Sequence, residues 1–315
     1  MSAHMKGRVM ANSNVVSSDR SPLVSVVIPH KGPDAGLDQC LAALRNQTFS
    51  ESKFEVLVVL NEPKDRRESM NIDSKISVLW QPSGGVYSAR NLGLLAARAN
   101  VLAFTDSDTI PTPYWIEAGF QCLEKGATLV AGNILVTSRF SPPTPSACYE
   151  MLFSFDQEKY ARFGQSTTAN LFALSAVFQK QGLFSGDAQT GEDFDWTDRA
   201  TRAGETMAFC PVAAVLHPAR ESMSELVLKA KRDSVPPELY AGWVSLVSYG
   251  SRRWFRRFAV PPSAKRIRRV GMKGTALALC VAASLQGIKG YLYLRAMIRR
   301  INLWRRSDGG ASGPS

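Results

Sequence analysis

Three short apolar runs in the first third of the chain restrict its fold more than any other feature. They occupy residues 24–28, 56–60 and 101–104, and β-branched and large aliphatic side chains dominate them. Helical patterns lie between them, at residues 37–45 and 87–99. Short strands that are apolar on both faces and alternate with helices are typical of a parallel sheet covered by helices on both faces. The sequence therefore predicts an α/β fold with a mostly parallel sheet.

The pattern becomes less regular after residue 110. Further helices and strands are expected at residues 115–124, 128–136, 168–177, 191–203 and 207–216. The prolines at positions 142, 143 and 145 predict a loop between two of these elements. We expect residues 21–220 to form one α/β domain.

Basic residues are concentrated near the C-terminal end of the chain. The chain has 38 Lys and Arg against 27 Asp and Glu, and residues 252–306 contain 15 of the basic residues and no acidic one. Arginines interleaved with aromatic residues and leucines are typical of a helix that lies on an anionic membrane, where each basic residue contributes about 1 kcal/mol. We therefore expect residues 221–306 to be a helical, basic, membrane-associating region. A helical extension packed on the body is the alternative, and nucleic-acid binding is less favoured.

The ends of the chain and the cysteines indicate the cellular compartment of the protein. Residues 1–20 are polar without the apolar core of a secretory signal, so a disordered leader is expected there, with a disordered tail at residues 307–315. The five cysteines are scattered and never spaced as CxxC, which favours a reducing compartment. No run of about 18 apolar residues occurs, so the sequence predicts no membrane span.

An acidic turn, Asp106-Ser107-Asp108, directly follows the apolar run at residues 101–104. Ligands of open α/β sheets bind at this edge, and two carboxylates at i and i+2 suit Mg²⁺ or Mn²⁺ bridging to phosphates. The alternative is an ordinary acidic turn before a helix. His217, at the end of the last strand, would complete a mixed oxygen and nitrogen site or serve a structural role.

Two further motifs have both a functional and a structural interpretation. Gly191-Glu192-Asp193 begins a helix, where a carboxylate could act as a general base or simply favour the helix dipole. Arg90, on the predicted helix at residues 87–99, could contact a phosphate or remain a surface arginine.

The order of these motifs resembles that of family 2 nucleotide-sugar glycosyltransferases over residues 23 to about 220. The resemblance is carried by segments at residues 24–29, 47–48, 84–93, 104–108 and 191–193 and by His217. It implies the GT-A fold, in which a Rossmann-like half binds a nucleoside-diphosphate sugar, here a UDP- or GDP-sugar, and a second half receives the acceptor.

The resemblance also implies roles for individual residues. Asp106, Asp108 and His217 would bind Mn²⁺ or Mg²⁺, and Asp193 would be the catalytic base. Donor binding is implied for Pro29, Asn61, Arg90, Asp106 and Asn170, and the acceptor side for Glu192 and Trp196. Leu60-Asn61 departs from the family, which has two aspartates there, and Lys31 replaces a common aromatic-Asn pair.

The expected activity is metal-dependent, inverting sugar transfer to a hydroxyl of a glycan or lipid-linked acceptor, in polysaccharide or glycolipid biosynthesis. The expected location is cytoplasmic, attached peripherally to the inner face of the cell membrane. A nucleotidyltransferase is an alternative, although residues 29–32 are a poor version of its Gly-rich basic loop. A non-catalytic membrane-bound scaffold is another, favoured by Leu60 and opposed by retention of the acidic residues and His217.

Overall fold

The computed structural model describes residues 21–233, except 66, 68, 69, 71 and 189, and residues 262–308. Three predicted segments lie outside the described residues. They are the leader, residues 309–315 of the tail, and residues 252–261 of the basic region. Within the described part, one eight-stranded sheet has the order β3-β2-β1-β4-β7-β6-β8-β5.

The first half of the sheet is parallel, as predicted. Its strands are β1 (Val24–His30), β2 (Phe54–Asn61), β3 (Ser77–Gln81) and β4 (Val101–Thr105). The short helix η1 (Glu51–Lys53) precedes β2, and the helices between the strands are α1 (Ala35–Arg45) and α2 (Val86–Ala96). All three strand pairs in this half are parallel.

The second half of the sheet is mixed. Its strands are β5 (Ile110–Pro111), β6 (Leu129–Thr137), β7 (Asn170–Leu174) and β8 (Met207–Pro218). Strand β7 runs antiparallel to both β4 and β6, β8 is parallel to β6, and β5 is antiparallel to β8. The sheet is therefore mixed rather than parallel throughout.

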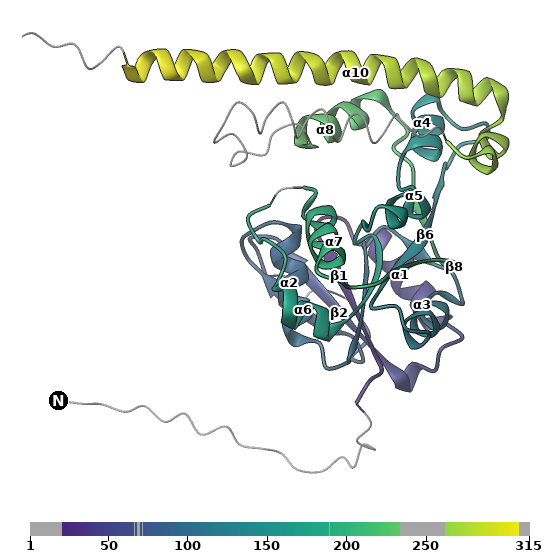
Figure 1. Cartoon of the computed structure of the whole chain (residues 1–315). Helices are drawn as coiled ribbons and strands as arrows, with labels where there is room; N and C mark the ends of the chain where they lie inside the picture. Colours follow the sequence, from purple (N-terminus) through teal and green to yellow (C-terminus); the bar gives the residue numbers. More distant parts are fainter. Residues whose placement is uncertain are drawn as a thin grey trace, which may run out of the picture.

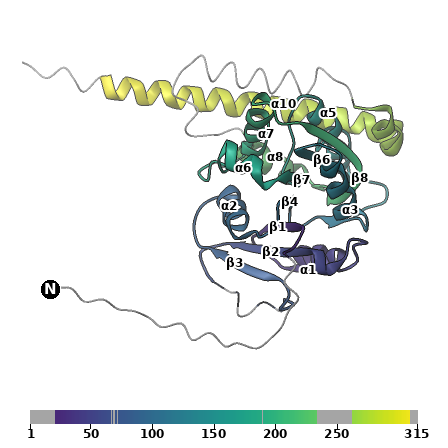
Figure 2. The ribbon, with the colours of Figure 1, turned by 60° about the horizontal axis from the view of Figure 1, so that its bottom comes forward.

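Helices cover both faces of the sheet, as Figure 2 shows. Side chains alternate along each strand, so Val26 and Ile28 pack in one core with α1 and with α3 (Trp115–Glu124), whereas Val27 packs in another. The second core includes α2, α6 (Ser175–Gln181) and α7 (Glu192–Arg202). The predicted α/β class, with helices on both faces, is confirmed.

The predicted proline-rich loop is shorter than expected, because its last proline begins a helix. Helix α4 (Pro145–Phe153) has Pro145 in its first turn, where the missing N–H costs no hydrogen bond. The Thr144 hydroxyl caps it by accepting from the Ala147 N–H at 3.1 Å. A second short helix, α5 (Gln157–Arg162), follows.

Two helices follow the sheet, and the second of them packs on both α4 and the first (Figure 1). They are α8 (Met223–Asp233) and α10 (Ala264–Asp308), which is interrupted at Gly271, where φ is 77°. Buried apolar side chains join the three helices: Cys148, Tyr149, Leu152, Leu226, Ala278, Val281, Ala282 and Leu285. By length and composition alone, one described helical stretch, Ala264–Tyr291, could cross a membrane, although the sequence predicted no span.

Candidate active site

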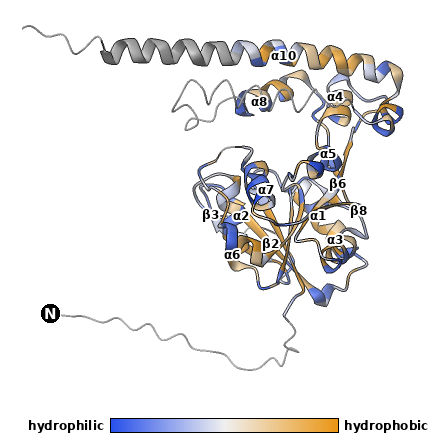
Figure 3. Ribbon diagram, in the orientation of Figure 1, coloured by the Kyte–Doolittle hydropathy of each residue, from blue (hydrophilic) through white to orange (hydrophobic). Residues whose placement is uncertain are grey.

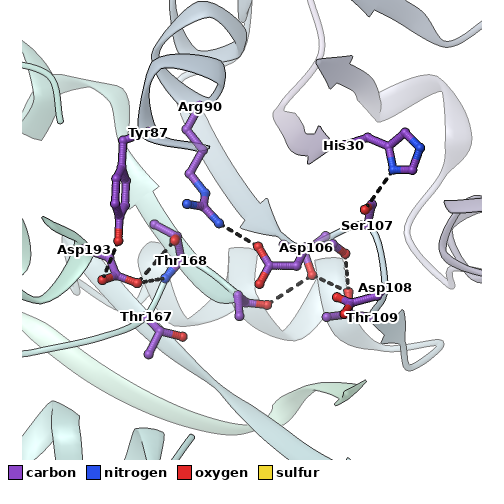
Figure 4. Close-up of polar contacts among 12 residues, drawn as sticks. His30, Tyr87, Arg90, Asp106, Ser107, Asp108, Thr109, Thr167, Thr168 and Asp193 are labelled. Atoms are coloured by element: carbon purple, nitrogen blue, oxygen red, sulfur yellow. Dashed lines mark hydrogen bonds and ion pairs between the residues drawn. The ribbon is translucent and has the colours of Figure 1, made fainter. Parts of the chain in front are cut away.

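The acidic turn after β4 is held rigidly. The Thr109 hydroxyl donates to the Asp106 carbonyl oxygen at 2.8 Å and lies 2.7 Å from the Thr105 hydroxyl (Figure 4). Helix α1 packs directly against the turn, since a Cβ added at Gly36 would lie 3.3 Å from the Asp108 Cα. The backbone therefore fixes where the two carboxylates project.

His217 reaches this turn because of the strand pairing. Strand β5 follows the turn at once, and its Ile110 pairs with Leu216, the residue before His217. The His217 Nε2 lies 4.0 Å from Asp108 Oδ1, and one ligand atom from each of Asp106, Asp108 and His217 lies within 4.8 Å of the others. The structure thus brings together the three side chains that the sequence resemblance grouped.

The donor set fits a divalent cation. The His217 Nδ1 lies 2.8 Å from the Pro218 carbonyl oxygen, which can only accept, so Nδ1 carries the hydrogen and Nε2 is available as a ligand. Two carboxylates and one imidazole suit Mn²⁺ or Mg²⁺. The pKa of Asp108 is raised, chiefly because the surrounding protein removes solvent from the carboxylate, although 54% of the side chain stays exposed. The charge of His217 lowers this pKa, and the charge of Asp106 raises it.

Arg90 is not a surface arginine. Its side chain is 5% exposed, and its Nη2 donates to Asp106 Oδ1 at 2.6 Å. The guanidinium carbon lies 5.3 Å from the centre of the Tyr87 ring, and Nε is buried with no hydrogen-bond partner in the part of the chain that the structure describes. Arg90 therefore orients Asp106 and partly neutralises the acidic turn.

Asp193 lies buried at the start of α7, just after Gly191, whose φ of 84° a larger residue would strain. Its Oδ1 accepts from the Tyr87 hydroxyl at 3.0 Å and from the Phe194 N–H at 3.1 Å. Its Oδ2 accepts from the Thr168 N–H at 3.1 Å and from the Thr168 hydroxyl at 3.4 Å. These four contacts fix the orientation of the carboxylate.

Tyr87 is a site residue that the sequence analysis missed. It contacts both Arg90 and Asp193, so it links the acidic turn to the start of α7 (Figure 4). Burial, followed by the charge of Asp193, raises the pKa of Tyr87 well above its usual value, so the hydroxyl keeps its proton. Its position three residues before Arg90, on the same helix face, was the available signal.

The structure corrects two predicted roles. Asn170 was expected to contact the donor, but it is fully buried: its Oδ1 accepts from the Trp115 indole at 2.8 Å, and its Nδ2 donates to the Asn133 and Ala213 carbonyl oxygens. Trp196 was expected on the acceptor side, but no part of it is exposed. Its rings stack on Phe178 with centroids 4.0 Å apart. Both side chains belong to the core.

Glu192, which was expected on the acceptor side, hydrogen-bonds a loop of the protein. It is buried, and its Oε1 accepts from the Ser185 N–H at 2.9 Å. The same loop is held by Asn91, whose amide both donates to and accepts from the Phe184 backbone, at 2.8 and 3.1 Å. Glu192 thus fixes the segment that precedes Asp193.

The remaining predicted donor residues lie at the carboxyl ends of β1 and β2. Pro29 is buried within β1, and Asn61 ends β2 partly exposed. His30, which the sequence analysis did not select, lies beside them: its Nδ1 is 3.0 Å from the Ser107 hydroxyl, and its Nε2 is 2.9 Å from Asp34. The β1 end is therefore tied to the acidic turn.

Comparisons with known proteins identify the family of the chain. A model of the family described as Glycosyl transferase family 2 matches residues 25–177. Glycosyltransferase AglE of Haloferax volcanii is 33% identical over 222 residues, which cover 67% of this chain and 71% of that protein. The pre-mycofactocin glycosyltransferase of Mycobacterium tuberculosis is 30% identical over 220 residues, covering 65% of this chain and 45% of the relative.

A solved structure shares the fold. S. aureus TarS 1–349, in complex with UDP-GlcNAc, superposes with a TM-score of 0.52 at 14% identity, covering 84% of this chain and 81% of that one. This neighbour agrees with the predicted GT-A fold, and the sequence relatives exclude the nucleotidyltransferase alternative. The chain belongs to glycosyl transferase family 2 and is a glycosyltransferase.

Proposed function

We propose that this enzyme transfers a sugar from a nucleoside-diphosphate sugar to a hydroxyl of a glycan or lipid-linked acceptor, with inversion, at an anionic membrane surface. The observation that carries the proposal is the convergence of Asp106, Asp108 and His217 on one point at the sheet edge. The buried chain of contacts from Arg90 through Tyr87 to Asp193 connects this point to a second carboxylate.

Asp106, Asp108 and His217 would hold Mn²⁺ or Mg²⁺, which supplies charge neutralisation for a diphosphate leaving group. Arg90 adds a fixed positive charge behind Asp106, in a place from which water is largely excluded. Positive charge arranged in advance where negative charge develops is the main way such a site lowers a barrier.

The donor would lie across the carboxyl ends of the parallel strands. The UDP-GlcNAc bound to the TarS structure supports a nucleoside-diphosphate sugar as the donor class. Pro29 would line the nucleoside pocket and the Asn61 amide would hydrogen-bond the base. Leu60 is fully buried, so it cannot replace the base-reading aspartate of other members.

Asp193 would remove the proton from the attacking hydroxyl. The Tyr87 hydroxyl and the backbone N–H groups of Thr168 and Phe194 orient the carboxylate. The Thr168 hydroxyl makes the longest of the four contacts, at 3.4 Å, and an acceptor hydroxyl could take that place. One base and one displacement give inversion at the anomeric carbon, and the family resemblance suggests the same outcome.

The surface of α10 supports membrane attachment. Residues 274–288 contain no charged side chain, yet only one face, with Ala278, Val281, Ala282 and Leu285, is buried. The exposed side of this uncharged stretch is mostly apolar, which is typical of a helix surface in contact with lipid or with another protein. Basic residues precede this stretch, at Lys265, Arg266, Arg268, Arg269 and Lys273, and Lys289 follows it (Figure 3).

Because its inner face packs on α4 and α8, α10 would lie along the interface rather than span it, with its outer face in the headgroup region. In this arrangement the enzyme would be attached peripherally to the inner face of the cell membrane. It also favours a lipid-linked or membrane-exported acceptor, in glycolipid or polysaccharide biosynthesis.

A donor-hydrolysis panel tests the activity without a known acceptor. The full chain is incubated with UDP- and GDP-sugars in Mn²⁺, in Mg²⁺ and in EDTA, and the released nucleoside diphosphate is measured. We expect slow hydrolysis of one donor class with a cation and none in EDTA. Equal hydrolysis in EDTA would refute the metal-dependent part of the proposal.

A further inference from the structure

The start of α10 reaches the end of α4. The Arg266 Nη1 donates to the Ser154 carbonyl oxygen at 2.8 Å and lies 3.3 Å from the carbonyl oxygens of Met151 and Leu152, while Nη2 donates to the Phe155 carbonyl oxygen at 3.0 Å. The last carbonyl groups of a helix lack partners within it, and a basic side chain can satisfy them. Arg266 is therefore the cap of α4, supplied from a segment more than a hundred residues later.

Phe155 connects this cap to the metal site. Its φ is 52°, the only positive φ of a residue other than glycine among the described residues, and a bulky side chain adopts this conformation only where its surroundings hold it. Its ring centre lies 4.4 Å from that of the His217 imidazole, at an interplanar angle of 36°. The ring thus covers one face of the imidazole whose Nε2 points toward Asp108.

A second contact fixes the same strand end to α4. Glu150 is fully buried, and it accepts from the Arg220 backbone N–H at 2.9 Å and from the Arg220 guanidinium at 2.8 Å. Arg220 stands three residues after His217, so α4 binds the chain just beyond the imidazole. A displacement of α4 would therefore displace His217.

We propose that Arg266 is a positioning residue, which holds Phe155 against His217 and thereby sets the affinity of the site for its cation. The inference rests on the metal site proposed above. It adds that α10 acts on that site through α4. Binding of α10 to the membrane and binding of the cation to the site are therefore energetically coupled. By linkage, any effect of membrane binding on cation affinity is matched by an equal effect of the cation on membrane binding.

Manganese binding by the full chain tests this inference without any turnover. Free Mn²⁺ is followed by electron paramagnetic resonance during titration of wild type, Arg266→Ala, Phe155→Leu and the double variant. Groups that orient a metal ligand typically change affinity by about tenfold or more. We expect about tenfold weaker binding in each single variant, and no further loss in the double variant, because both act through one contact.

Two control variants distinguish the effect of the position of Arg266 from the effect of its charge. Arg268→Ala removes the same charge from an exposed position two residues later on the same helix, and it should bind Mn²⁺ as wild type does. Arg266→Lys, which can still donate to the α4 carbonyl groups, should recover part of the affinity. Wild-type affinity in Arg266→Ala, or an equal loss in Arg268→Ala, would overturn the proposal.

Failure of the metal site itself gives a different result. If wild type and Asp108→Ala bind Mn²⁺ equally, the proposed site is wrong and the positioning role falls with it. If Asp108→Ala alone loses binding, the site stands and the role of Arg266 is overturned. Should Arg266→Ala not fold, Arg266→Gln takes its place: wild-type affinity in that variant overturns the role of Arg266, and weakened binding supports it.

Discussion

Tyr87 and Asp193, 106 residues apart in the sequence, share a buried hydrogen bond of 3.0 Å from the tyrosine hydroxyl to the carboxylate. The same tyrosine ring lies beside the Arg90 guanidinium, which binds Asp106. Helix α2 therefore sets the position of both carboxylates, the proposed base and the proposed metal ligand. Its sequence was expected to supply only a phosphate contact.

Removal of the Tyr87 hydroxyl should reduce turnover. Tyr87→Phe keeps the ring packing but takes one charge-assisted hydrogen bond from Asp193, worth about 1.5–3 kcal/mol. We expect kcat to fall about tenfold or more while the KM for the donor stays unchanged. Steady-state kinetics of donor hydrolysis provide the measurement, and a change confined to the donor KM would contradict the orienting role.

Asp193→Asn should retain donor binding and lose turnover. The amide keeps the size of the side chain but cannot accept a proton, so we expect a loss of about 10²–10⁴-fold in kcat. Asp195→Asn, at an exposed position on the first turn of the same helix, is the matched control and should remain active. Near-normal turnover in Asp193→Asn would refute its assignment as the base.

Asn170→Ala should affect stability and not donor binding. The change leaves the Trp115 indole and two backbone carbonyl groups, of Asn133 and Ala213, without their buried partner. Each unsatisfied group costs about 1–3 kcal/mol, so the free energy of unfolding should fall by about 3 kcal/mol or more. Urea denaturation measures the loss; a donor KM that rises severalfold at unchanged stability would restore the original interpretation of Asn170.

Apolar residues on the outer face of α10 should determine membrane binding. Leu279 and Ala283 are exposed one turn apart, and Leu279→Asp with Ala283→Asp places two charges where lipid contact is proposed. We expect sedimentation with anionic vesicles to weaken at least about tenfold. Leu95→Asp, at an exposed leucine on α2, is the control, and equal binding by all three proteins would exclude this face as the docking surface.

The parallel half of the sheet could be predicted because its strands are apolar on both faces. Predicted residues 24–28, 56–60 and 101–104 became β1, β2 and β4 with one to three added residues. Strand β5 has two residues and no periodicity, and the antiparallel insertion of β7 depends on long-range pairing. No local pattern encodes either feature.

The proposed metal site could be predicted because the course of the backbone sets the positions of its residues. Asp106 and Asp108 follow β4, and His217 lies near the end of β8 at the same sheet edge, so their meeting could be anticipated from the family motif order. Asn170 and Trp196 were misplaced because a polar or aromatic side chain looks the same in sequence whether it faces a ligand or a buried partner. Their partners lie elsewhere in the fold, at Trp115 and Phe178.

Calorimetric titration of nucleoside diphosphate tests the central claim most directly. UDP and GDP are titrated into wild type and Asp108→Ala, each in Mn²⁺ and in EDTA. The account predicts that one nucleotide binds wild type at least about tenfold more tightly with Mn²⁺, and that Asp108→Ala removes this difference. Binding that is equally tight in EDTA, or unchanged dependence on Mn²⁺ in Asp108→Ala, would contradict it.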